Sequence, residues 1–81
     1  MKIYVGNLSF ETTAVEMRSL FEKYGTVNSA EVAVDRKTRR SKGFGFVVMP
    51  IASEARDAVE KLDGFNLGRR VLRVNEARAS D

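Results

Sequence analysis

The 81-residue sequence predicts an α+β domain with the element order β-α-β-β-α-β. Two observations predict it: alternating, β-prone segments occur at four places, and two segments with the apolar period of a helix lie between them. A chain of this length has room for one domain. Because both crossovers are expected to be right-handed, the two helices should cover one face of the sheet and leave the other open to water.

The first half of the chain predicts a strand, a helix and a second strand. Residues 2–6 alternate and are rich in β-formers. Thr13 and Glu16 have the spacing of a capping box, and the apolar positions that follow recur on one face of a helix. The valine-rich segment 27–34 is the second predicted strand.

The second half repeats this order after a polar, basic connection. Residues 42–49 form a third strand, and Pro50 ends it because proline cannot donate to a strand ladder. Residues 52–62 have the apolar period of a second helix. Residues 70–75 are predicted to form the last strand.

Composition excludes several kinds of site. The sequence contains no Cys and no His, which removes disulfides, cysteine-based zinc sites, thiol nucleophiles and histidine bases. No apolar run approaches the roughly 20 residues of a membrane-spanning helix. We therefore expect no metal, no cofactor and no membrane contact. The domain is predicted to cover residues 1–77, with a short polar tail over residues 78–81.

Three aromatic rings are predicted on the face that the helices leave open. Side chains alternate between the two faces of a strand, so the apolar partners of each strand suit the core. In the third strand Phe44 and Phe46 then point to solvent with Lys42, and in the first strand Tyr4 points outward with Lys2. Grouped exposed aromatic side chains commonly mark a binding site. Such rings stack nucleobases of any sequence, at about 1–3 kcal/mol per base.

The two aromatic strands also contain specific motifs. Residues 3–8 read Ile-Tyr-Val-Gly-Asn-Leu, and residues 42–49 read Lys-Gly-Phe-Gly-Phe-Val-Val-Met. They resemble the shorter and longer ribonucleoprotein motifs of the RNA-recognition-motif family, the longer being K/R-G-F/Y-G/A-F-V-x-F/Y. Met49 departs from this pattern, where the family prefers an aromatic residue. The whole chain is similar to the short stand-alone RNA-binding proteins of bacteria, and equally to one domain of a longer protein.

This resemblance implies a ferredoxin-like, four-stranded antiparallel sheet with the first and third strands central. It implies that single-stranded RNA binds to the open face, with Tyr4 and Phe44 stacking bases and Phe46 packing against bases or riboses. Lys42 would contact a phosphate, and the end of the last strand would contact bases through backbone and polar groups. The candidate RNA-binding residues are Lys2, Tyr4, Asn7, Arg40, Lys42, Phe44, Phe46, Arg73, Asn75, Glu76 and Ala77. For Asn7, contact with a base and ordering of a loop are both open.

Charge is distributed unevenly along the chain. The net charge is only +3, but acidic residues gather on or near the two helices and basic residues gather near the sheet. Residues 36–42 include five Arg or Lys residues, and the last strand is surrounded by Arg69, Arg70, Arg73 and Arg78. This distribution directs a phosphate backbone to the sheet. Many relatives have Thr-Gly-Arg where this chain has Thr-Arg-Arg at residues 38–40, which leaves the geometry of that turn open.

Other functions are compatible with the same order of elements. Some family members bind proteins, commonly where the sheet aromatics are lost, so the retained rings favour RNA. Acylphosphatases share the order of elements but need an arginine in the loop after the first strand, and residues 6–12 contain no Arg or Lys. We therefore predict a binding protein and no enzyme. Single-stranded DNA is the alternative ligand, and we expect a cytoplasmic monomer, or a nuclear location for a fragment of a eukaryotic protein.

Overall fold

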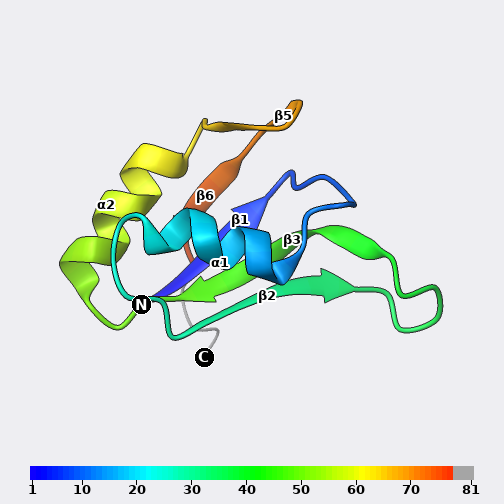
Figure 1. Cartoon of the computed structure of the whole chain (residues 1–81), viewed down its shortest axis with the longest axis horizontal. Helices are drawn as coiled ribbons and strands as arrows, with labels where there is room; N and C mark the ends of the chain where they lie inside the picture. Colours follow the sequence, from blue (N-terminus) through cyan, green and yellow to red (C-terminus); the bar gives the residue numbers. More distant parts are fainter. Residues whose placement is uncertain (78–81) are drawn as a thin grey trace.

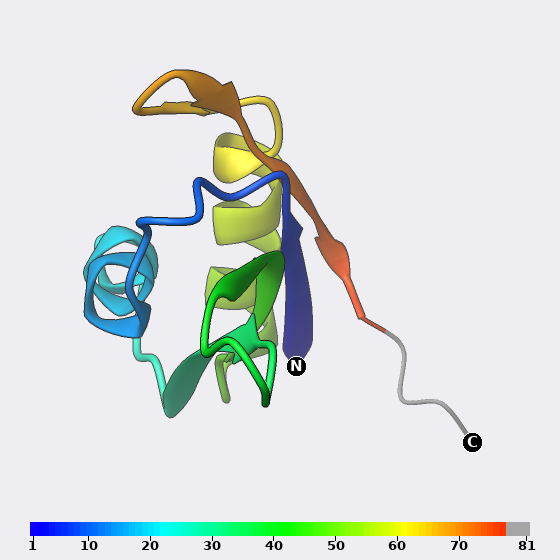
Figure 2. The same cartoon turned by 90° about the vertical axis from the view of Figure 1, so that its right-hand side faces the viewer.

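The computed structural model describes residues 1–77, in which two helices pack on one face of a four-stranded antiparallel sheet (Figure 1). The strand order is β2-β3-β1-β6, so the first and third strands are central, as predicted. Figure 2 shows both helices on the same side of the sheet, which leaves the opposite face without a covering layer. The predicted tail over residues 78–81, with Arg78, lies outside the described residues.

The elements follow the predicted order, with one small hairpin added. They are β1 (Lys2–Gly6), α1 (Ala14–Glu22), β2 (Ser29–Val34), β3 (Ser41–Val48), α2 (Ala52–Leu62), β4 (Asn66–Leu67), β5 (Arg70–Val71) and β6 (Arg73–Glu76). β2 begins at Ser29 rather than at residue 27, and β3 runs one residue earlier than predicted. Within residues 1–77, neither helix is long and apolar enough to cross a membrane.

α1 begins at the predicted capping box. The Glu16 N–H donates to Thr13 Oγ1 at 3.1 Å, and the Thr13 N–H donates to Glu16 Oε1 at 2.9 Å. These reciprocal bonds satisfy backbone donors that the first turn of a helix leaves unpaired. The apolar face that follows, with Met17, Leu20 and Phe21, is buried against the sheet.

The core lies between the sheet and the helices, and the predicted alternation is confirmed. Ile3 and Val5 of β1 are fully buried, as is Val47 of β3. Gly45 lies on the same face of β3, where the nearest neighbour of an added Cβ would be the Glu31 carbonyl oxygen of β2, ahead of Met17 Cε at 2.9 Å. Glycine at this position therefore allows the backbone of β2 to approach β3 closely.

The prediction of one last strand over residues 70–75 is wrong, because the chain divides at Leu72. β5 pairs with β4 in a separate two-stranded hairpin, and only β6 joins the main sheet beside β1. The Leu72 N–H donates to the Phe65 carbonyl and its own carbonyl accepts from the Gly64 N–H, both at 2.9 Å. The hairpin turn begins with Gly68 at φ 66°, a conformation that glycine adopts readily.

Candidate nucleic-acid interface

Three aromatic rings form one cluster at the centre of the open sheet face. Tyr4 of β1 lies opposite Phe46 of β3, and Phe44 lies two residues away on the same side of β3. The Tyr4 and Phe44 rings are stacked, with centroids 6.0 Å apart and planes at 29°. Phe46 meets Tyr4 and Phe44 edge to face, at 5.9 and 6.0 Å. All three rings are half-buried, so they support one another and keep solvent-exposed surface. We call these three rings the aromatic platform.

The sheet register arranges further side chains in rows across the platform. Directly opposed residues of neighbouring strands share a face. The central row crosses the sheet in the order Glu31, Phe46, Tyr4, Asn75. Arg73 lies opposite Gly6 in the adjacent row. Two of the candidate residues of the last strand, Arg73 and Asn75, therefore lie on the platform side of the sheet.

Lys2 supplies a positive charge at the edge of the platform. Its Nζ lies 4.5 Å from the centroid of the Phe46 ring, within the range of a cation–π interaction. Lys2 itself is exposed and lies opposite Val48, one row from the aromatic cross-strand pair. The ammonium group is therefore placed where it can reach both a ring and a phosphate on the same face.

At the end of β6 the backbone is accessible at the free edge of the sheet, whereas not every side chain lies on the platform side. Glu76 lies opposite a buried residue of β1, so its side chain points away from the platform side. The Val74 N–H donates to Asp63 Oδ1 at 3.0 Å and not to β1. Backbone groups of successive residues in an antiparallel strand point alternately toward and away from the partner strand, so the backbone of Glu76, two residues further on, also faces the free edge. The Ala77 N–H donates to the Lys2 carbonyl at 2.8 Å and extends the pairing with β1.

Asn7 joins the end of β1 to the hairpin. Its backbone takes a left-handed φ of 61°. Its Nδ2 donates to the Val71 carbonyl at 2.7 Å, and its Oδ1 accepts from Arg70 Nη1 at 2.9 Å. The Arg70 guanidinium also lies 5.7 Å from the Phe10 ring centroid. Both ends of the Asn7 amide are thus used within the protein, which favours the loop-ordering role over contact with a base.

The basic connection between β2 and β3 forms a defined turn. Asp35 Oδ1 accepts hydrogen bonds from the N–H groups of Thr38 and Lys37, at 3.0 and 2.8 Å. These bonds, the one from Thr38 first, hold the pKa of Asp35 below its usual value of 3.8. Arg39 takes a left-handed φ of 62°, at the position where the family resemblance led us to expect glycine. The turn that glycine would favour is therefore kept, with an arginine in it.

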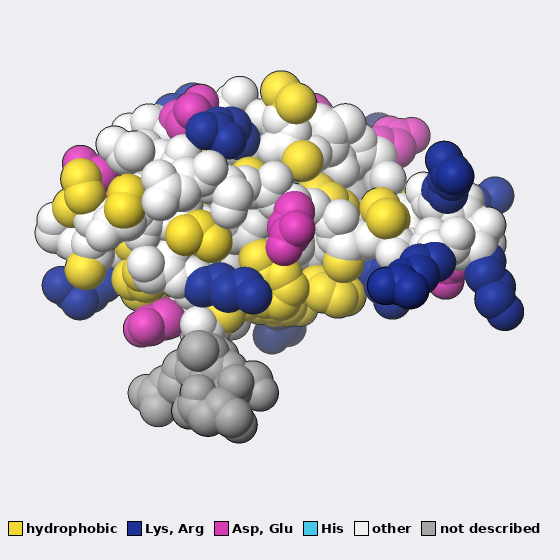
Figure 3. All heavy atoms as spheres, turned by 90° about the horizontal axis from the view of Figure 1, so that it is seen from below, with side chains coloured by type: hydrophobic (Ala, Val, Ile, Leu, Met, Phe, Trp, Pro, Cys, Tyr) yellow, Lys and Arg dark blue, Asp and Glu magenta, His cyan; other side chains and the backbone are white. Residues whose placement is uncertain are grey.

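This turn displays its positive charges to solvent. Arg40 and Lys42 are both exposed. Figure 3 shows Lys and Arg side chains gathered at the right-hand end of the molecule, where Figure 1 places the connection between β2 and β3. The predicted basic edge of the sheet is thus present beside the aromatic platform.

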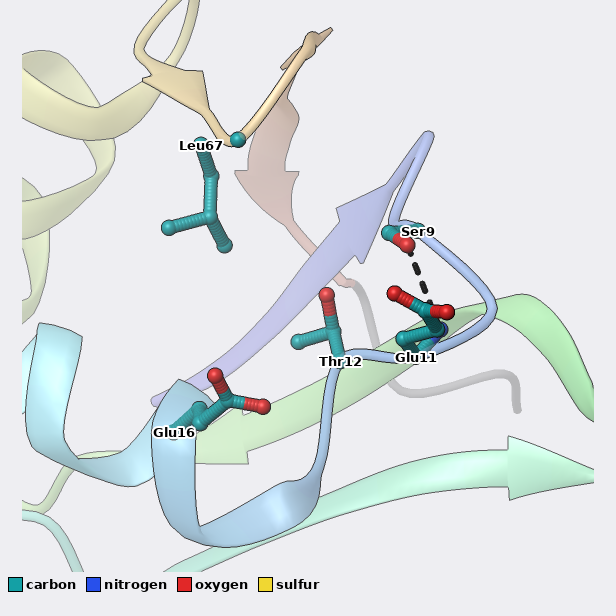
Figure 4. Close-up of a pocket in the computed structure, with 6 residues that line it drawn as sticks. Ser9, Glu11, Thr12, Glu16 and Leu67 are labelled. Carbon is teal, nitrogen blue, oxygen red and sulfur yellow. Dashed lines mark hydrogen bonds between the residues drawn. The ribbon is translucent and has the colours of Figure 1, made fainter.

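A shallow hollow of about 200 Å³ lies apart from the platform, between the β1–α1 loop, the start of α1 and the hairpin. Figure 4 shows Glu11 and Glu16 at this hollow, across from Leu67. Glu16 is already bonded in the capping box, and the Glu11 N–H donates to Ser9 Oγ at 3.2 Å. Two carboxylates repel phosphate, which makes this hollow an unfavourable place for a nucleic-acid backbone.

Glu31 is a residue of the platform face that the sequence analysis missed. It is exposed and lies directly opposite Phe46. The available signal was the alternation in β2, where Ala30 and Val32 pack against the core and leave Glu31 to the other face. No motif covers β2, so the register with β3 was needed to bring this carboxylate beside the rings.

An open antiparallel sheet with half-buried, solvent-facing aromatic rings at its centre and a basic loop at its side defines a platform for single-stranded nucleic acid. The chain belongs to the RNA recognition motif family, whose model matches residues 3–73. The fold and family predicted from the sequence are therefore confirmed.

Two relatives differ in how much of their length the chain spans. The 28 kDa chloroplast ribonucleoprotein of Spinacia oleracea is 47% identical over 76 residues, which make up 94% of this chain and 33% of that protein. RbpB of a Nostoc species is 45% identical over 78 residues, which make up 96% of this chain and 76% of that protein. The chain thus spans about a third of the spinach protein and about three quarters of the Nostoc protein.

Solved structures share the same fold over the full chain. The crystal structure of RNA binding protein PG1 superposes with a TM-score of 0.95 at 43% identity, covering 100% of this chain and 98% of that one. A complex of the Sxl-lethal protein with RNA has a TM-score of 0.93 at 28% identity, covering 99% of this chain and 48% of that one.

Proposed function

We propose that this domain binds single-stranded RNA on the open face of its sheet, in a binding role without a chemical reaction. The observation that carries the proposal is the aromatic platform itself, three solvent-facing rings on a face that neither helix covers. Rings of this kind stack single-stranded bases at about 1–3 kcal/mol each. Packed base pairs do not offer those faces, so a single strand is the ligand that fits.

In this proposal the RNA crosses the sheet with its bases against the aromatic platform and its phosphates toward the basic residues. Tyr4 and Phe44 stack bases, and Phe46 packs against a base or a ribose. Asn75 lies opposite Tyr4, where its amide can hydrogen-bond to the edge of the base on that ring. The free backbone edge at the end of β6 offers further donors and acceptors. The phosphate contacts come from Lys2, Arg40, Lys42 and Arg73.

The likeness to a chain solved in complex with RNA, and to a chloroplast ribonucleoprotein, supports RNA over DNA as the ligand. Recognition of the 2′-hydroxyl is what separates the two. We propose that the domain acts as a monomer in the cytoplasm or an equivalent compartment. The test of the ligand is therefore a matched pair of RNA and DNA strands of one sequence.

Truncation of one ring tests the proposal. Phe46→Ala should weaken binding of a short labelled single-stranded RNA by about 1–3 kcal/mol, measured by fluorescence anisotropy. Because Phe46 is only half-buried, thermal unfolding should show that the variant still folds cooperatively. Phe65→Ala is the matched control, since it removes an equal ring from an exposed position outside the main sheet. Equal RNA affinity of the wild type and Phe46→Ala would refute the proposal.

A further inference from the structure

Glu31 places a negative charge on the face proposed to bind a polyanion. Its backbone lies directly opposite Phe46 in the β2–β3 register, and its side chain is exposed. Lys2 lies over the same ring from β1, with Nζ 4.5 Å from the centroid. Phe46 therefore has a cation over its ring from the β1 side and an exposed acidic residue as its cross-strand neighbour on the β2 side.

No structural duty accounts for the Glu31 carboxylate. Within residues 1–77, the Glu31 side chain forms no ion pair and accepts no hydrogen bond. β2 is an edge strand, and charged side chains protect such edges from pairing with other chains. A lysine would protect the edge equally and would also attract phosphate. Protection of the edge therefore does not explain why the charge is negative.

We infer that Glu31 selects the base bound beside Phe46, favouring guanine and disfavouring uracil; this inference rests on the proposed function. A carboxylate only accepts hydrogen bonds. Guanine presents two adjacent donors, N1–H and the N2 amino group, which match the two oxygens of one carboxylate. Adenine and cytosine each present one amino donor next to an acceptor nitrogen. Uracil presents a single N3–H between two carbonyl oxygens, which a carboxylate repels.

The size of the expected preference follows from the contact. A bidentate contact to a base edge discriminates between bases by about five- to 150-fold in protein–DNA complexes. Glu31 is exposed, so its contact falls toward the low end of this range. We expect a preference of about tenfold for guanine over uracil, with adenine and cytosine between them.

The test uses single-stranded RNA in which one base changes in a constant background. Wild-type protein is titrated with the labelled oligomers UUUGUUU, UUUAUUU, UUUCUUU and UUUUUUU, since isolated guanines avoid four-stranded assemblies. The expected result is that UUUGUUU binds about tenfold more tightly than UUUUUUU. Equal affinity for these two oligomers would overturn the inference while leaving RNA binding intact. Absence of binding to all four at low salt would instead overturn the proposed function.

A charge-matched pair of variants isolates the carboxylate. In Glu31→Gln the ratio between UUUGUUU and UUUUUUU should fall toward one, while affinity for UUUUUUU rises because a repulsive charge is lost. Glu60→Gln makes the same change of net charge on the exposed side of α2 and should leave the ratio at its wild-type value. Amide NMR spectra check that both variants are folded. A ratio in Glu31→Gln equal to that of the wild type would overturn the inference.

Discussion

The ring of Tyr4 lies back over Gly6, two residues further along β1. A Cβ added at Gly6 would lie 2.6 Å from Tyr4 Oη and 2.8 Å from Tyr4 Cε2, closer than such atoms approach. Any side chain at Gly6 must therefore displace this ring, which otherwise stacks on Phe44 at 6.0 Å. The glycine of the shorter motif thus helps to position an aromatic ring of the platform.

We expect Gly6→Ala to weaken RNA binding by up to about 1–3 kcal/mol, the contribution of one stacked base. The displaced atoms are the far end of a mobile side chain, so urea denaturation should show no loss of folding stability. A double-mutant cycle tests the cause: once Tyr4→Ala is present, Gly6→Ala should have no further effect on affinity. Additive losses would show that Gly6 acts in some other way than through the ring.

Lys42→Ala and Lys61→Ala remove the same charge from different sides of the domain. Lys42 begins the longer motif beside the platform, whereas Lys61 lies in the last turn of α2. If Lys42 contacts a phosphate, its loss should reduce the slope of log K against log salt by about 0.7, the value for single strands. Lys61→Ala should leave the slope unchanged. Equal slopes for the wild type and Lys42→Ala in a salt series would argue against a phosphate contact.

Arg39 holds a left-handed conformation that costs about 1–2 kcal/mol for a residue with a Cβ. Arg39→Gly should remove this strain, whereas Arg39→Ala should keep it. The two variants lose the same charge, so they should weaken RNA binding equally. We expect Arg39→Gly to be more stable than Arg39→Ala by about 1 kcal/mol in urea denaturation. Identical stability of the two variants would contradict the strained turn.

The turn at Asp35 should respond to acid. The pKa of Asp35 is lower in the folded protein than its usual value of 3.8. The ionised carboxylate therefore stabilises the folded turn fully at pH values above 3.8, and this contribution is lost as the pH falls through the lower pKa of the folded state. The amide NMR signals of Lys37 and Thr38 should therefore titrate with a midpoint below 3.8. Asp35→Asn retains an acceptor oxygen but cannot ionise, and should abolish the titration. A wild-type midpoint at or above 3.8 would contradict the two hydrogen bonds.

The sequence was sufficient to predict the sheet face that carries the rings. β1 and β3 alternate regularly, and each carries a motif, so the inward positions of Ile3 and Val47 and the outward positions of Tyr4 and Phe46 follow from period alone. The capping box at Thr13 was predictable for the same reason, since it depends on residues three apart. Local patterns of this kind do not depend on the rest of the fold.

Features set by tertiary contacts were not predictable in the same way. Residues 70–75 were predicted as one strand, and only the hydrogen bonds of Leu72 to the preceding connection divide this part of the chain into β5 and β6. Glu31 belongs to the platform face only because β2 pairs with β3 in this register, which shifts between Val32 and Val34. The turn at Arg39 could not be predicted, because a left-handed backbone conformation is usually associated with glycine and this position holds an arginine.

Single-stranded RNA is proposed to bind on the aromatic platform. The most direct measurement is an NMR titration of isotope-labelled protein with a pool of short random single-stranded RNAs, at low and moderate salt. If RNA binds there, signal shifts should concentrate at Tyr4, Phe44, Phe46 and Asn75, which share one face of the sheet. Shifts confined to α1 and α2, or no shifts at low salt, would contradict it and would point to a protein partner instead.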